Sequence, residues 1–260
     1  EIIDILNSEK MDEMIDSFVE IRKGKNTRED AVKLLKSPTY FGTMMIKLGM
    51  ADAMVAGAVY STGDTIRPAL QIIKTKAGNS RISGAMLMLG PNDERYIFAD
   101  IAININHDAN GLAEVAYQSA ETAKLFGIDP KIAMLSFSTK GSAKSKEVDL
   151  VTEALEIAKE KYPDLCIDGE LQFDAAISQN VANLKAPNST VAGKANVFIF
   201  PDLQSGNIGY KIGQRLGGYK AIGPILQGLA APIADLSRGC DEEDVYKLSI
   251  LTGLQAQSQN

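Results

Sequence analysis

Short apolar runs alternate with segments of helical spacing along most of this 260-residue sequence, and that alternation limits the fold more than any other feature. The runs 53–59, 132–137 and 195–200 are typical of strands buried on both faces of a parallel sheet. Turns with glycine or hydroxyl residues follow them and lead into helices. Repeated strand–turn–helix units predict an α/β protein with mostly parallel sheets.

One stretch departs from the parallel pattern. Residues 82–89 and 96–103 both have strand character, and the turn Gly90-Pro91-Asn92-Asp93 separates them. A turn of this kind joins neighbouring strands, so the sequence predicts an antiparallel pair here. In open α/β sheets ligands bind at the carboxyl ends of strands, which directs attention to the turns that follow them.

Composition excludes several classes of protein. The net charge of −6 argues against a nucleic-acid partner, and no apolar run is long enough to cross a membrane. Cys166 and Cys240 lie in no CxxC pair, so we expect neither a disulfide scaffold nor a metal site. No basic-then-apolar leader opens the sequence, and we expect a cytoplasmic protein. Because the chain starts at Glu1 rather than methionine, we also expect that a natural N-terminal segment is absent.

The stretch 231–244 contains the strongest chemical signal. Ser237, Arg238 and Asp244 supply a hydroxyl, a guanidinium and a carboxylate. Ser237 and Asp244 are seven residues apart, about two helical turns, so a helix beginning here would point both the same way. Such a set accepts a proton and holds a phosphate. These residues alone favour another interpretation, in which Asp241 and Asp244 cap a helix.

Two further turns contain hydroxyl and cationic groups after a strand. The turn 60–68 leads into a helix and suits an anion. An ordinary connecting turn between a strand and a helix explains the same residues equally well. The loop 138–145 does not have P-loop spacing and is more in keeping with a single phosphate or a sugar phosphate. The residues of interest in the two turns are Ser61, Thr62, Arg67, Ser138, Thr139, Lys140, Gly141 and Ser142.

A helix over 203–216 would place hydrogen-bonding groups on one face, through Asn207, Lys211, Gln214 and Arg215. Its glycines do not follow the GxGxxG order of a dinucleotide site. The basic turn 22–25 has the composition of a solvated turn. His107 is the only histidine, and we expect it to be solvated or to cap a helix rather than to serve in a catalytic triad.

Taken together, several stretches resemble the phosphotransacetylase (phosphate acetyltransferase) family. The stretches are ADAMVAGA (51–58), STGD (61–64), IRPALQ (66–71), SFSTKGS (136–142), FPDL (200–203), GNI (206–208), YK (210–211), QRL (214–216) and DLSRG (235–239). They span nearly the whole chain in one order.

The resemblance implies two α/β domains around a cleft, similar to the isocitrate and isopropylmalate dehydrogenases, in a protein that is usually a homodimer. Domain I would comprise 1–76 and 228–260, and domain II 77–227. The implied reaction interconverts acetyl-CoA and phosphate with acetyl phosphate and CoA, with CoA as a substrate and no tightly bound cofactor.

The resemblance also implies residue roles. Asp244 would take the proton from the CoA thiol, Ser237 would be hydrogen-bonded nearby and Arg238 would hold substrate. Arg67 and Arg22 match arginines of the family. The proposed substrate-binding set is Arg67, Arg22, Ser61, Thr62, Ser138, Thr139, Lys140, Gly141, Ser142, Asn207, Lys211 and Arg215.

Other interpretations stay open at this point. A phosphate butyryltransferase has the same chemistry and a roomier acyl pocket, and a non-catalytic acyl-CoA-binding regulatory module would keep the fold without activity. Cys240 offers a route through an acetyl-cysteine, which needs a nearby base. A dehydrogenase is disfavoured because the sequence has neither a nicotinamide fingerprint nor an aspartate cluster.

Overall fold

The chain forms two compact units in a computed structural model that describes residues 2–258. Unit 1 contains residues 2–77 and 229–258, and unit 2 contains residues 78–228. Each of the two boundaries between the units lies one residue from the domain boundary expected from the sequence. That each unit is a domain that folds on its own stays a prediction.

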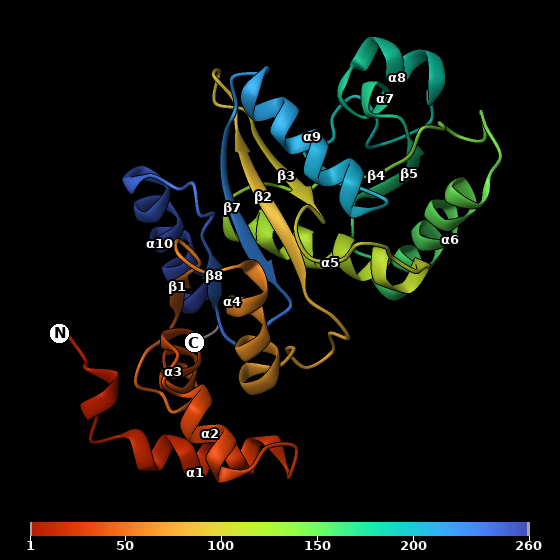
Figure 1. Cartoon of the computed structure of the whole chain (residues 1–260). Helices are drawn as coiled ribbons and strands as arrows, with labels where there is room; N and C mark the ends of the chain where they lie inside the picture. Colours follow the sequence, from red (N-terminus) through yellow and green to blue (C-terminus); the bar gives the residue numbers. More distant parts are fainter. Residues whose placement is uncertain (1, 259–260) are drawn as a thin grey trace. The chain divides into compact units, whose positions relative to one another are not determined.

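Unit 1 is helical around one short pair of strands (Figure 1). Strand β1 pairs with β8 in parallel, with Met54 opposite Ile233 and Ala56 opposite Asp235. The elements are η1 (Ile5–Asn7), α1 (Met11–Arg22), α2 (Arg28–Leu34), α3 (Pro38–Lys47), β1 (Met54–Ala56), α4 (Thr62–Pro68), η2 (Ala69–Ile73), β8 (Ile233–Asp235) and α10 (Glu242–Gln257).

Three helices of unit 1 begin with a reciprocal cap. In α2, α4 and α10 the N-cap side chain accepts from the backbone N–H three residues on, and the acid at that position accepts from the N-cap N–H. The N-caps are Thr27, Ser61 and Asp241. Each cap satisfies backbone donors that would otherwise have no partner, so these starts are set by local sequence.

Strand β1 corrects one prediction. The run 53–59 was expected to be a strand buried on both faces, but only Met54–Ala56 is strand and all three residues are half-buried. Within unit 1, β1 pairs with β8 alone. Gly57 follows with a φ of +105°, a conformation that ends the strand.

Unit 2 contains a six-stranded mixed sheet in the order β7-β2-β3-β6-β4-β5. Strand β2 is antiparallel to both β3 and β7, whereas the pairs β3–β6, β6–β4 and β4–β5 are parallel. The antiparallel pair expected around residues 90–93 is confirmed. The strands are β2 (Ser83–Leu89), β3 (Arg95–Ala99), β4 (Ile132–Leu135), β5 (Ile167–Leu171), β6 (Val197–Ile199) and β7 (Lys220–Gln227).

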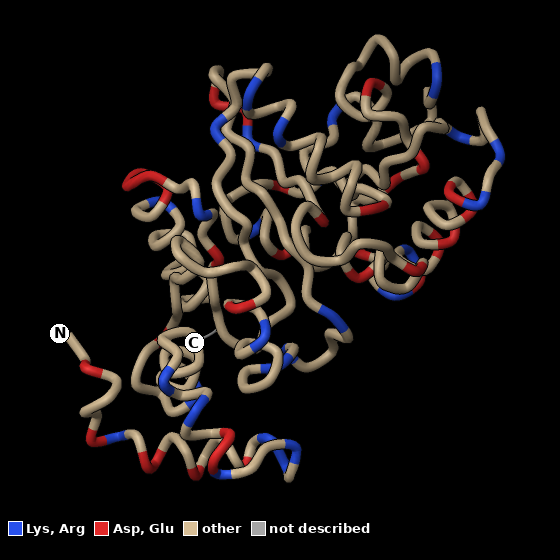
Figure 2. Tube along the Cα trace, viewed as in Figure 1, with Lys and Arg blue, Asp and Glu red and all other residues tan. Residues whose placement is uncertain are grey.

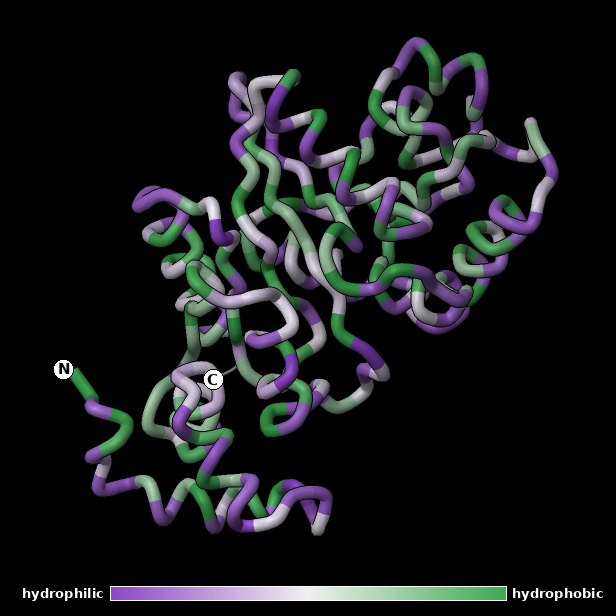
Figure 3. Tube along the Cα trace, viewed as in Figure 1, coloured by the Kyte–Doolittle hydropathy of each residue, from purple (hydrophilic) through white to green (hydrophobic). Residues whose placement is uncertain are grey.

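Helices cover both faces of this sheet, with α5 and α6 on one face and α9 on the other (Figure 1). Strands β4, β5 and β6 are buried along their length, as expected for parallel strands covered on both faces. On the hydropathy scale of Figure 3 the residues of β4 and β6 are hydrophobic, whereas β5 includes the acids Asp168 and Glu170 and α6 is mixed. The helices are α5 (Ala109–Leu125), α6 (Lys146–Lys161), α7 (Phe173–Ile177), α8 (Gln179–Lys185) and α9 (Leu203–Arg215).

The segment 173–185 forms two short helices. Ser178 has extended dihedral angles, φ −100° and ψ 118°, and separates α7 from α8. A residue outside the helical region cannot continue the i to i−4 hydrogen bonds, so the helix restarts.

Candidate functional site

The turn between β1 and α4 presents two hydroxyls and an arginine to solvent. Ser61 caps α4, and its hydroxyl donates to the Asp64 carboxylate at 2.7 Å. Thr62 begins the helix and Arg67 lies in its last turn, and both side chains are exposed. Within residues 2–258 Arg67 forms no ion pair, so its guanidinium is available to an anion.

Arg22 and Arg67 lie around the same tyrosine. Tyr40 is buried, and its hydroxyl donates to Oε1 of Gln71 at 2.9 Å. Burial raises the pKa of Tyr40, and the positive charges of Arg67 and Arg22 act against that shift. Arg22 is also held by Asn26, at 2.8 Å from its Nε. The structure therefore brings two arginines from α1 and α4 to one place in unit 1, which the solvated-turn interpretation of 22–25 did not foresee.

The end of β8 leads through an exposed turn into α10. Ser237 and Arg238 are exposed, and the Ser237 hydroxyl accepts from the Gly239 N–H at 3.2 Å. Asp244 is half-exposed and accepts from the Asp241 N–H at 3.3 Å through Oδ2. Among the described residues nothing donates to Asp244 Oδ1. One carboxylate oxygen therefore completes the cap while the other stays available.

The helical spacing argument for Ser237 and Asp244 is wrong. The helix begins only at Glu242, because Asp241 is its N-cap. Ser237 lies in the preceding turn, where its carbonyl accepts from the Cys240 N–H. The described residues include no hydrogen bond between Ser237 and Asp244. The acidic start of α10 is visible as a red stretch in Figure 2.

Asp235 was not singled out by the sequence, yet it is the most buried carboxylate near this turn. It is the last residue of β8 and is 2% exposed. Burial raises its pKa, and the hydroxyls of Thr62 and Thr65 oppose the shift as hydrogen-bond donors. Its Oδ1 atom has no hydrogen-bond partner among the described residues. The apolar run Ala231–Leu236 gave no hint of a special acid, because Asp235 looks like a strand-ending polar residue.

The loop 138–142 in unit 2 is folded around two acids of β5. Glu170 accepts from the Ser138 hydroxyl at 2.8 Å and from the Gly141 N–H at 2.7 Å. Lys140 Nζ donates to Asp168 at 2.5 Å and to the Gly169 carbonyl at 2.6 Å. Burial raises the pKa of Asp168, but its bonds from Lys140, Ser189 and Gly169 outweigh that and hold it below the usual value.

The remaining groups of this loop also have partners inside the protein. Ser142 Oγ accepts from the Thr139 N–H at 3.0 Å, and Thr139 Oγ1 donates to Gln172 at 3.2 Å. Ser138 and Thr139 are buried, whereas Lys140, Gly141 and Ser142 are exposed. The sequence could not show this, because the acids that engage the loop lie about thirty residues further along the chain.

Helix α9 carries the other substrate-binding candidates of unit 2. Asn207 is half-buried and donates to the Ile101 carbonyl at 3.1 Å. Lys211 and Arg215 are exposed, and Lys211 Nζ lies 5.7 Å from the centre of the Tyr210 ring. Asn207 thus fixes the helix to the chain after β3, while the two cations are free of ion pairs in the described part of the chain.

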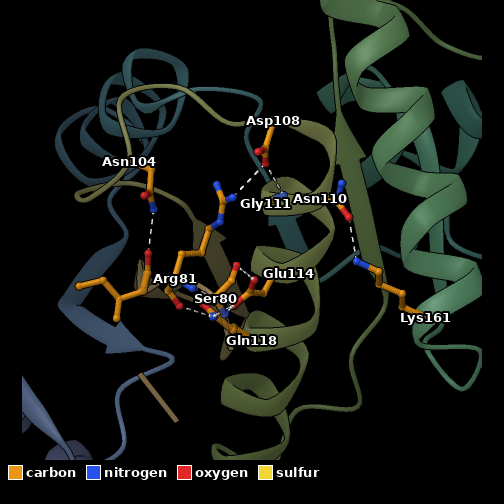
Figure 4. A network of polar contacts seen from close by, with 10 residues as sticks. Ser80, Arg81, Asn104, Asp108, Asn110, Gly111, Glu114, Gln118 and Lys161 are labelled. Atoms are coloured by element: carbon orange, nitrogen blue, oxygen red, sulfur yellow. Dashed lines mark hydrogen bonds and ion pairs between the residues drawn. The ribbon is translucent and has the colours of Figure 1, made fainter. Parts of the chain in front are cut away.

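A buried polar network joins α5 to the beginning of β2 (Figure 4). Glu114 accepts from the Ser80 N–H at 2.8 Å, from the Ser80 hydroxyl at 2.5 Å and from the Arg81 N–H at 3.2 Å. Gln118 donates to the Arg81 carbonyl at 2.9 Å. Glu114 and Gln118 are tolerated in the buried face of α5 because the polar atoms of both side chains are hydrogen-bonded.

His107 corrects another prediction. It was expected to be solvated or to cap a helix, but it is 8% exposed and the N-cap of α5 is Asp108. Neither ring nitrogen has a hydrogen-bond partner within residues 2–258. Burial lowers the pKa of His107, and the nearby Asp100 carboxylate opposes that shift. The neutral ring is therefore the form that fits its surroundings.

Among residues 2–258, no group of three or more histidine, cysteine or acidic side chains is placed to hold a metal ion. No helix within the same residues is long and apolar enough to span a membrane.

An α/β protein that presents arginines, hydroxyls and a carboxylate after its strands has the features of an enzyme that binds an anionic substrate. Residues 1–253 match the family model described as "Phosphate acetyl/butaryl transferase", and the chain belongs to that family.

Similar proteins agree with the family assignment. The chain is 60% identical over 261 residues to a phosphate acetyltransferase of Staphylococcus epidermidis, with 98% of this chain and 79% of that protein covered. It is similar to the crystal structure of a phosphotransacetylase from Streptococcus pyogenes, with a TM-score of 0.96, 62% identity and coverage of 98% and 78%.

A more distant structure has the same fold. A putative 4-hydroxythreonine-4-phosphate dehydrogenase from Salmonella typhimurium matches with a TM-score of 0.54 and 15% identity, over 87% of this chain and 71% of that one. The expected likeness to dehydrogenase folds is confirmed at the level of the fold.

Proposed function

We propose that this acyltransferase moves an acetyl group between CoA and inorganic phosphate by direct attack, with Asp244 as the base. The reaction is acetyl-CoA + phosphate = acetyl phosphate + CoA. The single observation that carries the proposal is the 60% identity to a phosphate acetyltransferase over nearly the whole chain. The exposed Arg238 and the free oxygen of Asp244 support the roles given to these residues.

The base has a defined task. The CoA thiol loses its proton before it attacks the carbonyl of acetyl phosphate, because the thiolate is the nucleophile. Asp244 Oδ1 takes that proton while Oδ2 keeps the α10 cap. In the reverse direction the same carboxyl returns the proton to the departing thiolate of acetyl-CoA.

The arginines hold the phosphate. Arg22 and Arg67, both near Tyr40, and Arg238 after β8 supply the planar donors that match phosphate oxygens. As the acetyl group departs, negative charge grows on those oxygens and the guanidiniums stabilise it. Ser61 and Thr62 at the start of α4 complete the proposed anion site, where their hydroxyls exchange their present bonds, that of Ser61 to Asp64 among them, for bonds to the phosphate. Ser237 orients the reacting groups beside Arg238.

The residues proposed in unit 2 bind CoA through the polar groups that make no bond inside the described part of the protein. Ser138 and Thr139 shape the loop, while Lys140, Gly141 and Ser142 are exposed on it. Lys211 and Arg215 on α9 offer cationic side chains to the phosphates of CoA, and Asn207 holds that helix in place. No tightly bound cofactor takes part in this scheme.

A route through acetyl-Cys240 is disfavoured. Cys240 is a free, half-exposed cysteine, and no basic side chain bonds to it among the described residues. Activation of a cysteine usually needs a neighbouring base. Both substrates held together in one complex give the thiol direct access to the acetyl carbon.

We further propose a cytoplasmic homodimer. Ile208, Ile212 and Leu216 are exposed along α9, and a cavity of about 420 Å³ lined by apolar and aromatic side chains lies beside this helix. Exposed apolar side chains gathered on one helix are a common feature of subunit interfaces. Size-exclusion chromatography with light scattering tests the mass in solution.

The test of function is CoA-dependent release of phosphate from acetyl phosphate, with butyryl phosphate measured in parallel. Turnover with acetyl phosphate that exceeds turnover with butyryl phosphate supports the acetyl enzyme. The reverse order makes it a butyryltransferase. CoA binding without turnover, measured by titration calorimetry, indicates the non-catalytic acyl-CoA-binding module.

A further inference from the structure

Two buried polar atoms without partners lie at the end of β8 in unit 1. They are Asp235 Oδ1 and Thr65 Oγ1, and within residues 2–258 no other atom of unit 1 shares this state. Asp235 is 2% exposed and Thr65 is fully buried. Helix α4, which carries Thr65, packs against β8, which ends at Asp235, and the Thr65 hydroxyl acts against the rise in the pKa of the Asp235 carboxyl. A buried donor and a buried acceptor on packed elements, each without a partner, would be stabilised by pairing.

The backbone around Asp235 is tightly packed. The Leu236 N–H donates to the Ala56 carbonyl at 2.6 Å, which joins the ends of β8 and β1. A Cβ placed on Gly57 would overlap Asp235 Oδ1 and lie 2.5 Å from the nitrogen and the oxygen of Leu236. The carboxyl therefore has no room to move toward β1. The hydroxyls that act on it, those of Thr62 and Thr65, belong to α4.

This position connects two arginines. Thr65 precedes Arg67 by two residues on α4, and Asp235 precedes Arg238 by three residues at the end of β8. Both arginines are exposed and form no ion pair in the described part of the chain. Thr62 and Thr65 of α4 both act on the Asp235 carboxyl, so this carboxyl links α4 to the strand that leads into the Ser237–Arg238 turn.

We propose that Asp235 is a positioning residue, which pairs with Thr65 when a phosphate draws α4 inward and so sets Arg67 against Arg238. Asp235 does not touch the substrate, because its Oδ1 atom is buried. This inference rests on the proposed function, which gives Arg67 and Arg238 the phosphate group. In this proposal Thr65 Oγ1 and Asp235 Oδ1 pair only when the anion is bound. The affinity for the anion therefore depends on a contact inside the protein.

The experiment compares Thr65→Val with Thr43→Val. Valine removes the hydroxyl and keeps the shape. Thr43 is a matched control, since it is fully buried in unit 1 and its hydroxyl bonds only the Thr39 carbonyl of its own helix. The readouts are kcat, the KM for acetyl phosphate, the KM for CoA, and the rise in unfolding temperature that inorganic phosphate causes.

Thr65→Val is expected to raise the KM for acetyl phosphate by about tenfold, the loss of one buried hydrogen bond, while kcat and the KM for CoA change by less than about twofold. The stabilisation by phosphate shrinks in parallel. Thr65→Ser, which keeps the hydroxyl, and Thr43→Val both match the parent in KM. Asp235→Asn keeps an acceptor oxygen, so its KM for acetyl phosphate should rise by less than that of Thr65→Val. This variant replaces Thr65→Val in the test if Thr65→Val does not fold.

Equal KM values in Thr65→Val and Thr43→Val overturn the inference. Failure of the proposed function looks different, since the parent chain then has no acetyl phosphate activity. In that case the phosphate stabilisation still decides, because an inactive parent that loses this stabilisation in Thr65→Val alone supports the positioning role. If Arg67→Gln leaves the KM for acetyl phosphate unchanged, the arginine assignment that the inference needs is wrong.

Discussion

The loop 138–142 of unit 2 and the turn 237–244 of unit 1 look alike in sequence and differ in structure. Both follow a strand, both contain at least one hydroxyl and a cation, and both lead into a helix. In the loop, Lys140 is bonded to Asp168 and Ser138 to Glu170. In the turn, Arg238 forms no ion pair within the described residues and Asp244 keeps one oxygen free.

The difference shows that residue type after a strand is a weaker guide to a site than whether the protein itself satisfies those residues. A donor already bonded to a buried acid gains little from a ligand, because the ligand must replace an existing bond. An exposed guanidinium without a partner in the protein gives up only its bonds to water when it binds an anion. The turn of unit 1 therefore fits substrate chemistry better than the loop of unit 2.

The largest effect should come from Asp244→Asn. The amide keeps the shape and the cap acceptor but takes no proton, so we expect kcat to fall by on the order of 10²–10³. The KM for CoA should stay within about twofold, since asparagine still fits the site. Steady-state kinetics of acetyl phosphate cleavage measures both. A variant with near-parent kcat shows that Asp244 is not the base, and Cys240→Ser is then the next variant to measure.

Arg238→Gln sharpens the comparison on the unit 1 side. Loss of a charged donor to phosphate should raise the KM for acetyl phosphate by about 10- to 100-fold. Thermal unfolding without ligand should be unchanged, because the side chain has no partner to lose. Arg28→Gln is a control of the opposite kind, since Arg28 pairs with Asp12 and Asp16 on the surface and should leave the KM at the parent value.

Lys140→Met tests the unit 2 side. It leaves Asp168, whose side chain is 12% exposed, without its main partner and should cost about 1–2 kcal/mol in urea unfolding, since Lys140 itself is 37% exposed. Adding Asp168→Asn should restore most of that loss. A rise in the KM for CoA that the double variant does not restore would assign Lys140 to the substrate instead of to the loop.

The smallest effect is a pH dependence at Asp235. Because burial raises its pKa in the folded state, the folded chain binds this proton more tightly than the unfolded chain, and stability falls as pH rises from the unfolded pKa through the folded one. Asp235→Asn has no proton to lose. Its stability relative to the parent should therefore increase with pH, by about 1.4 kcal/mol for each unit by which the pKa is raised.

Urea unfolding of both proteins between pH 4 and pH 8 measures this difference. A difference that decreases with pH would mean that the folded state favours the carboxylate. Thr62→Val and Thr65→Val should each raise the pKa of Asp235 further, because both hydroxyls stabilise the ionised carboxylate. In either background, the stability gained by Asp235→Asn should therefore increase more with pH.

The sequence by itself determined the fold class, the order of most strands and helices, and the family. Apolar periodicity fixes which segments become strands and helices. Three helices begin after the N-caps Thr27, Ser61 and Asp241, because each N-cap pairs with the residue three positions further on. The hairpin around 90–93 follows from the residues of its turn. These features depend on near neighbours in the chain, so the sequence contains them directly.

Only the tertiary structure decided which polar groups are free. It bonded Lys140 to an acid 28 residues away, buried His107 without a partner among the described residues, brought Arg22 and Arg67 near Tyr40 and buried Asp235 at the end of β8. Each of these outcomes depends on a side chain from a distant element. Burial and pairing set the charge, the pKa and the availability of a group, and neither can be read from residue type and spacing alone.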